Sequence, residues 1–91
     1  MSRVLMISYD LVNPGQNYES LIQKIKAYSK WARLGGSAYL ILTDKSPKEV
    51  RDSLAQVLDA NDKIWVGVAP APSAWKGLPP AVSNWIIANQ K

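Results

Sequence analysis

The sequence predicts an α+β domain in which a four-stranded antiparallel sheet carries two helices on one face. Four short runs rich in aliphatic and aromatic residues have the length of strands, and two longer stretches carry apolar residues at helical spacing. These segments follow one another as strand, helix, strand, strand, helix, strand. That order is the split βαβ, or ferredoxin-like, plan βαββαβ. A proline-rich arm and a short C-terminal helix are expected after it.

The first strand is expected at residues 3–10, because residues 4–7 form an almost continuous apolar run free of strand-breaking residues. The turn sequence Asn-Pro-Gly at residues 13–15 should follow it. A helix should then begin at Asn17 as its N-cap, because apolar side chains recur there every three or four residues. Its end is expected near Tyr28 or Ser29.

Residues 30–34 allow two interpretations. They could continue the first helix, or they could form a short strand that pairs with residues 37–43 across a Gly-Gly turn at residues 35–36. The alternation of Trp31 and Arg33 with smaller or apolar residues favours a short, irregular strand.

The second helix has the strongest sequence markers in the chain. Ser46 is an N-cap candidate, Pro47 stands at the first helical position, and Glu49 follows the serine by three residues. This pattern predicts a capping box with proline at a position where its missing N–H is not needed. The helix is expected to end around residues 59–61, where Asn61 could adopt the left-handed conformation.

The last strand is expected at residues 63–68. Residues 1–69 would then form the ferredoxin-like core. Residues 70–91 would form the proline-rich arm and a helix at residues 81–90, which packs on the core or on a dimer partner. A sheet with helices on one face only leaves its other face to be covered, either by this tail or by a second copy of the chain.

Composition excludes several kinds of site. The 91 residues contain 47% apolar and 20% charged residues, an ordinary balance for a single globular domain. Cysteine and histidine are absent, which excludes thiol chemistry, imidazole acid–base catalysis and zinc sites built on those residues. Carboxylates that hold a hard divalent cation remain available for phosphoryl chemistry. No membrane span or secretory leader is apparent, and we expect a cytoplasmic protein.

The net charge of +4 is concentrated in the middle of the chain. A positive patch there favours an anionic partner such as nucleic acid, with Lys30, Arg33 and Lys45 as candidate phosphate contacts and Trp31 or Tyr39 as candidate stacking residues. The alternative is that the lysines merely solvate the outer faces of two helices, and that the two aromatic residues belong to the core. Seven of the eleven basic residues lie in this region: Lys24, Lys26, Lys30, Arg33, Lys45, Lys48 and Arg51.

Asp10 is the leading candidate for a chemical site, because a strand should deliver its carboxylate to the edge of the core. The alternative is that Asp10 caps a turn by accepting hydrogen bonds from nearby backbone amides. Asp44 is the one other acid expected at the end of a strand. A single carboxylate is a poor cation site, so a metal-dependent mechanism would require two copies of Asp10 in a symmetric dimer.

Three stretches carry a resemblance to a known family: Val4-Leu5-Met6-Ile7-Ser8-Tyr9-Asp10, the region at residues 31–39 with its Ser37-x-Tyr39, and Ile64-Trp65-Val66. They resemble the small CRISPR-associated Cas-two family of nucleases and adaptation subunits. Three others are Ile7-Ser8-Tyr9-Asp10-Leu11, Pro14-Gly15-Gln16-Asn17-Tyr18, and the block at residues 40–51. These resemble more closely its SinR-type relatives, which share that fold. The resemblance covers about residues 3–70.

The resemblance implies a ferredoxin-like homodimer in which the two first-strand aspartates face each other near the twofold axis. In the family these carboxylates are thought to hold Mg or Mn, which assists phosphodiester hydrolysis of RNA or DNA. Asp10 matches the family position and would be both catalytic residue and metal ligand. Ser8 and Tyr9 could support it, and Ser37 matches a position that is often polar. The proline-rich tail departs from the simple fifth strand usual in the family.

Two other functions are open from the sequence. Some proteins of this fold bind nucleic acid without cleaving it, and the basic residues would serve that role equally well. The tail could instead make the chain a protein-interaction module, such as a toxin–antitoxin-like or mobile-element component. The residues that would carry such an interaction are Trp65, Trp75, Trp85 and the proline arm.

Overall fold

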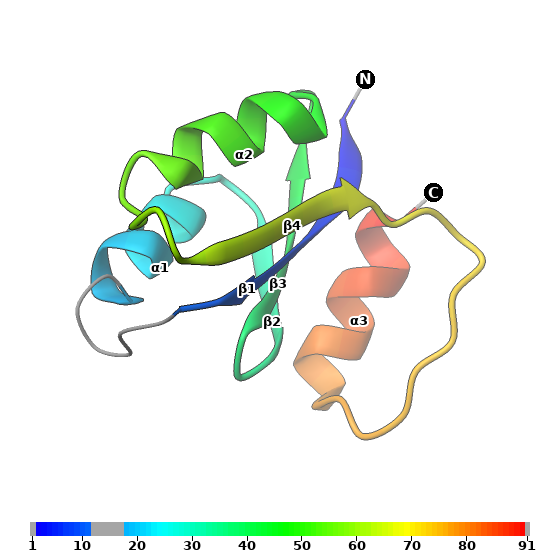
Figure 1. Ribbon diagram of the computed structural model, residues 1–91. Coiled ribbons are helices and arrows are strands. Elements are labelled where there is room, and N and C mark those ends of the chain that lie inside the picture. Colours follow the sequence, from blue (N-terminus) through cyan, green and yellow to red (C-terminus); the bar gives the residue numbers. More distant parts are fainter. Residues whose placement is uncertain (1, 12–17, 91) are drawn as a thin grey trace.

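The computed structural model describes residues 2–11 and 18–90, whose strands form one antiparallel sheet in the order β2-β3-β1-β4. This confirms the predicted α+β class, and the arrangement is compatible with a ferredoxin-like plan to which a third helix is added. The elements in chain order are β1 (Arg3–Asp10), α1 (Tyr18–Lys26), β2 (Trp31–Gly35), β3 (Ala38–Thr43), α2 (Pro47–Ala55), β4 (Lys63–Val68) and α3 (Pro80–Asn89) (Figure 1).

The main core lies between the sheet and the α1–α2 layer. β1 pairs with both β3 and β4, so its alternating side chains face two different layers. Leu5, Ile7 and Tyr9 of β1 face α1 and α2 and are buried there. The other buried members of this core are Leu11, Leu21, Ile25, Tyr39, Ile41, Val50 and Leu54.

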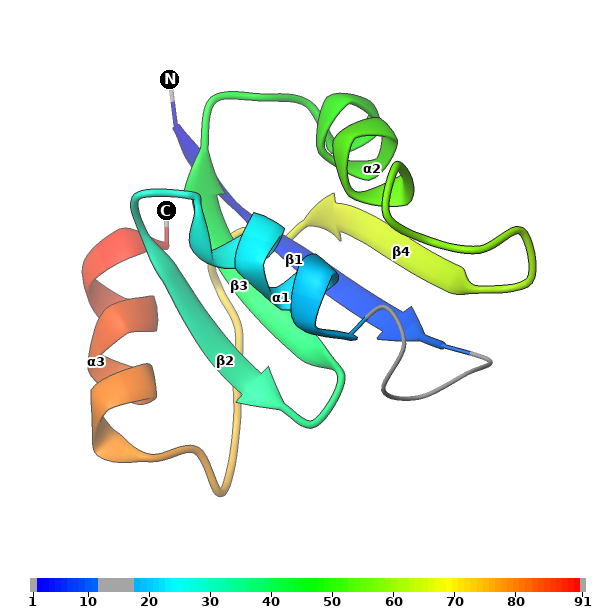
Figure 2. The same ribbon diagram turned by 90° about the vertical axis from the view of Figure 1, so that its left-hand side faces the viewer.

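α3 covers part of the opposite sheet face, as Figures 1 and 2 show. Ile86 of α3 is 4% exposed and packs with Val4 and Leu40 in a second cluster. The arm before α3 is tied back to the domain, since the Gln90 side-chain amide donates to the Ala69 carbonyl at 2.9 Å and to Ser73 Oγ at 2.8 Å.

Both α1 and α2 end earlier than the sequence predicts. α1 ends at Lys26 instead of Tyr28 or Ser29, because the Tyr28 N–H bonds to the Ile25 carbonyl, three residues back, and the chain turns toward β2. α2 ends at Ala55 instead of residues 59–61. The three amides that follow it, those of residues 56–58, likewise bond to carbonyls three residues back. None of the described non-glycine residues has a positive φ, so the left-handed cap predicted at Asn61 is wrong.

Two local predictions are confirmed: the hairpin formed by β2 and β3, and the capping box at the start of α2. Residues 30–34 contribute to a strand and not to the first helix, with β2 beginning at Trp31. Ser46 Oγ accepts from the Glu49 N–H, and Glu49 Oε1 accepts from the Ser46 N–H, each at 3.1 Å. The expected turn at residues 13–15 and the Asn17 cap lie outside the described residues.

Across residues 2–11 and 18–90, every helix is too short or too polar to cross a bilayer.

Candidate anion-binding cleft and the first-strand carboxylate

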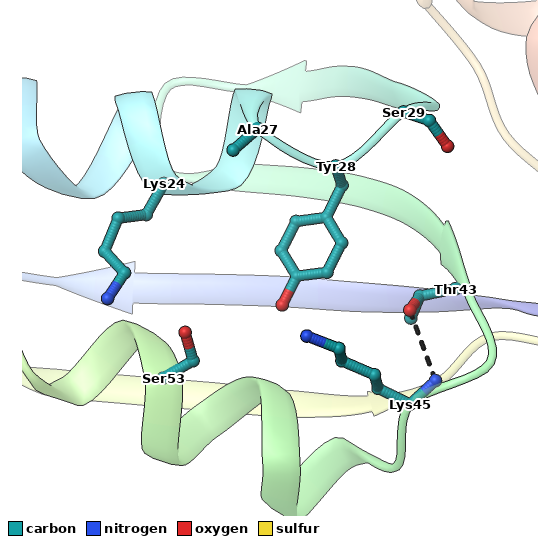
Figure 3. A pocket seen from close by; sticks show the side chains of 7 residues that line it. All are labelled: Lys24, Ala27, Tyr28, Ser29, Thr43, Lys45 and Ser53. Atoms are coloured by element: carbon teal, nitrogen blue, oxygen red, sulfur yellow. Dashed lines mark hydrogen bonds between the residues drawn. The ribbon is translucent and has the colours of Figure 1, made fainter.

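A cleft of about 350 Å³ opens between α1, α2 and the end of β3 (Figure 3). The end of α1 and the chain that leaves it form one wall, and the end of β3, the segment after it and α2 form the other. Of the described residues that line the cleft, none is acidic, and four carry hydroxyl groups. The lining residues are Lys24, Ala27, Tyr28, Ser29, Thr43, Lys45 and Ser53.

Two lysines line this cleft on opposite sides. In Figure 3, Lys45 extends from the segment between β3 and α2 toward the Tyr28 hydroxyl, whereas Lys24 extends from α1 toward α2. Lys24 Nζ donates a hydrogen bond of 3.1 Å to Gln56 Oε1. Lys45 Nζ lies 5.9 Å from the centroid of the Tyr28 ring, within the range of a cation–π contact. Neither contact neutralises an ammonium group, because the amide and the ring carry no net charge.

The titration of Tyr28 reflects its position in the wall of the cleft. Burial raises the pKa of its phenol, and the negative charge of Glu49 raises it further. Glu49 itself stays ionised because its hydrogen bonds with Ser46 lower the pKa of its carboxyl group, and the charge of Lys45 adds to this effect. Tyr28 therefore presents a neutral hydroxyl, which can donate a hydrogen bond to an anion.

These groups match the chemistry of a phosphate ligand. A phosphate oxygen accepts hydrogen bonds from ammonium and hydroxyl groups, and charge-assisted bonds of this kind are stronger than neutral ones. The cleft supplies two positive charges and the hydroxyls of Tyr28 and Ser53, with Ser29 and Thr43 nearby.

The predicted basic patch divides into two parts in the structure. Lys48 and Arg51 both pair with Asp52 at 2.7 Å, so this one carboxylate compensates one of their two positive charges. Lys26 and Lys30 continue the positive surface beside the cleft: Lys26 Nζ lies 4.9 Å from the Trp31 ring centroid, and Lys30 lies directly before β2.

The three basic residues singled out from the sequence do not form one cluster. The backbone carbonyl of Lys30 accepts from the Leu42 N–H, which places Lys30 at the same end of β3 as Lys45. Arg33 lies toward the other end of β2, opposite Tyr39, and its Nε donates to the Gly35 carbonyl at 3.0 Å. The structure thus brings Lys30 and Lys45 to one end of the sheet, and directs Arg33 to the hairpin.

The predicted stacking residues are less available than the sequence suggests. Tyr39 is 2% exposed, and its ring lies 6.0 Å from that of Trp31. Trp31 is 36% exposed, but Lys26 and Tyr39 both approach its ring.

The sequence analysis did not identify Lys24 and Tyr28 as residues of one site. Their spacing of four residues was the available indication, because it would place both side chains on one side of a helix.

Asp10 is exposed at the end of β1, beside a second hollow of about 190 Å³. The residues predicted to support it do not all face it. Tyr9 is buried on the α1–α2 side, and neighbouring strand residues point to opposite faces. The Ser37 carbonyl accepts from the Tyr9 N–H at 3.0 Å, so Ser37 lies beside β1. The hollow is lined by Ser8, Tyr9, Asp10, Lys63, Ile64 and Trp65.

Asp44 cannot join Asp10 at a shared site. Thr43 is opposite Arg3 in the β1–β3 register, seven residues from Asp10 along the strand. At roughly 3.3 Å per residue, this separates the two carboxylates by roughly 23 Å along the sheet. Within the residues that the structure describes, no three acidic side chains are grouped closely enough to hold a metal ion.

Comparison with known proteins does not extend these observations. No protein-family model matches the sequence, and no solved structure shows significant similarity to the chain.

Proposed function

We propose that this protein binds nucleic acid through its phosphate backbone, with the cleft between α1 and α2 as a principal contact. The observation that carries the proposal is that two lysines, Lys24 of α1 and Lys45 of the segment before α2, line this cleft. Neither pairs with a carboxylate in any ion pair of the described residues. Each can therefore exchange its counterion for a phosphate when the ligand binds.

A polyanion fits these positive charges better than a small anion does. Lys26 and Lys30 lie in the chain next to the cleft residues 27–29, and they extend the positive surface beyond the cleft itself. Successive phosphates of one strand could contact such a row of charges, whereas a single small anion would fill only the cleft. The net charge of +4 acts in the same direction by steering anionic partners to the protein.

The test is to measure the affinity for a fluorescein-labelled oligonucleotide by anisotropy over a range of salt concentrations. The variant Lys24→Ala/Lys45→Ala should bind more weakly. The slope of log K against log salt should fall by roughly 1.4 for a single strand, or roughly 1.8 for a duplex. The control Lys48→Ala/Lys76→Ala removes the same net charge from residues outside the cleft. Equal losses in both double variants would refute a role for the cleft and leave only a net-charge effect.

A second candidate function is metal-dependent cleavage of RNA or DNA by a homodimer, as the resemblance to the Cas-two family implies. The exposure of Asp10 at the end of a central strand favours it. Two copies of Asp10 would be needed to hold Mg or Mn, and Ser8 would be the neighbouring polar residue on the same face of β1.

Cleavage would be tested with the wild type and Asp10→Asn on single-stranded RNA and double-stranded DNA, with Mg, with Mn and with chelator. Oligomeric state would be measured alongside. Metal-dependent cutting by a wild-type dimer, but not by Asp10→Asn, would establish the nuclease. Equal cutting by both proteins, or a strictly monomeric wild type, would rule out the shared aspartate site.

A further inference from the structure

The sheet face that carries α3 is only half covered. The buried contacts of α3 are with Val4, near the start of β1, and with Leu40 of β3. On the same face, the half formed by β1 and β4 presents a large aromatic side chain, that of Trp65, which is 55% exposed. In Figure 2, α3 stands beside β2 and away from β4. An indole ring is thus left open to solvent on a rigid strand.

The position of this ring is set by the glycine two residues further along β4. A Cβ atom added at Gly67 would come closer than 3.0 Å to three adjacent carbons of the Trp65 ring, Cζ2, Cη2 and Cζ3. Because three adjacent ring atoms share this proximity, the ring lies over Gly67 and does not touch it with a single edge atom. One side of the indole therefore rests on the strand, and the other side is available to a ligand.

Polar groups of both charges surround this aromatic surface. Ser8 is opposite Trp65 in the β1–β4 register, and Asp10 is opposite Lys63. All four residues line the hollow of about 190 Å³. The core of a protein–protein interface is depleted in charged residues, so an isolated ring bordered by a lysine and an aspartate is a poor match for a protein partner. A ligand that combines a flat ring with polar edges, as in a nucleobase, and a nearby negative group, as in a phosphate, suits this surface better.

We propose that Trp65, held over Gly67, is a stacking site for an unpaired base of single-stranded nucleic acid. Lys63 would contact a phosphate of the same strand, and the Asp10 carboxylate would accept a hydrogen bond from an exocyclic amino group of the base. The inference rests on the proposed function for the nature of the ligand, and it adds a preference for single strands. Bases in a duplex are stacked on one another and cannot reach the indole.

The experiment compares the affinities of a labelled single-stranded oligonucleotide and of its duplex for four proteins. These are the wild type, Trp65→Ala, Gly67→Ala and the control Trp75→Ala, which removes a tryptophan of the arm that is 37% exposed. Trp65→Ala should bind the single strand roughly tenfold more weakly and leave duplex affinity unchanged. Gly67→Ala keeps every charge and the tryptophan, but it displaces the ring, so it should also weaken single-strand binding. Trp75→Ala should bind both ligands as the wild type does.

Each other outcome counts against the stacking site. Unchanged single-strand affinity in Trp65→Ala, or equal losses for single strand and duplex, would overturn it while leaving the phosphate contacts of Lys24 and Lys45 in place. Dissociation of a wild-type dimer by Trp65→Ala would show that the ring serves self-association instead. If the wild type binds neither ligand, the proposed function fails, and this inference fails with it.

Discussion

Lys24 donates a hydrogen bond of 3.1 Å to Gln56, which joins α1 to the residue that caps the end of α2. The bond orients the lysine side chain across the cleft while leaving its charge uncompensated. A carboxylate in place of the amide would keep the contact but neutralise the ammonium group. The neutral side chain at residue 56 should therefore matter for anion binding, and a charged substitution can test this.

We expect Gln56→Glu to weaken nucleic-acid binding, because Lys24 would then pair with a carboxylate at hydrogen-bond distance. Loss of one phosphate contact should reduce the salt slope by roughly 0.7 to 0.9. Asn84→Asp adds the same charge on the exposed surface of α3, on the other side of the sheet, and serves as the control. The prediction is contradicted if the two variants lose the same affinity in anisotropy titrations.

Ile86 and Ile87 are neighbours on α3 with opposite environments, since Ile86 is 4% exposed and Ile87 is 69% exposed. Ile86→Ala should lower the free energy of unfolding by about 2 to 5 kcal/mol, because it leaves a cavity beside Val4 and Leu40. Ile87→Ala should change it by less than about 0.5 kcal/mol. Urea unfolding followed by circular dichroism would measure both. Similar effects for the two variants would show that α3 does not cover the sheet in solution.

Local sequence patterns predicted most of the fold, for reasons visible in particular residues. The capping box of Ser46 and Glu49 is a short-range device, and the structure contains both of its hydrogen bonds. Helix ends were predicted less well, because Val57 and Leu58 continue the helical spacing of apolar residues beyond the end of α2. They pack against the core from turns that bond three residues back.

The cleft was harder to predict, because it joins residues that are distant in sequence. Lys24 lies 32 residues from Gln56, and it lines the same cleft as Lys45 only after α1 and α2 pack on the sheet. The role of Gly67 also depends on context. A glycine in a strand pattern indicates a close approach, but not which group approaches.

The capping-box carboxylate gives α2 a predictable sensitivity to acid. Folding lowers the pKa of Glu49 below its ordinary value of 4.5, chiefly through its hydrogen bonds with Ser46. The stabilisation is therefore complete above about pH 4.5, and it is lost as the pH falls through the lower pKa of the folded state. Glu49→Gln keeps an acceptor at this position but does not titrate. Its stability should fall less steeply than that of the wild type between pH 5 and pH 3 in thermal unfolding measurements, roughly the range in which this carboxyl titrates. Parallel curves would contradict the prediction.

Tyr28 should make the domain sensitive to base in the opposite sense. Burial and the charge of Glu49 raise the pKa of its phenol above 10.0, so the folded state holds this proton at a pH where the unfolded chain releases it. The associated stabilisation is present below about pH 10 and is lost as the pH rises through the higher pKa of the folded state. Above pH 10, the wild type should therefore lose stability more steeply than Tyr28→Phe, in which this group cannot ionise. Urea unfolding of both proteins at a series of pH values would measure the difference. Equal slopes in the two proteins would place the phenol in a solvated position and remove it from the wall of the cleft.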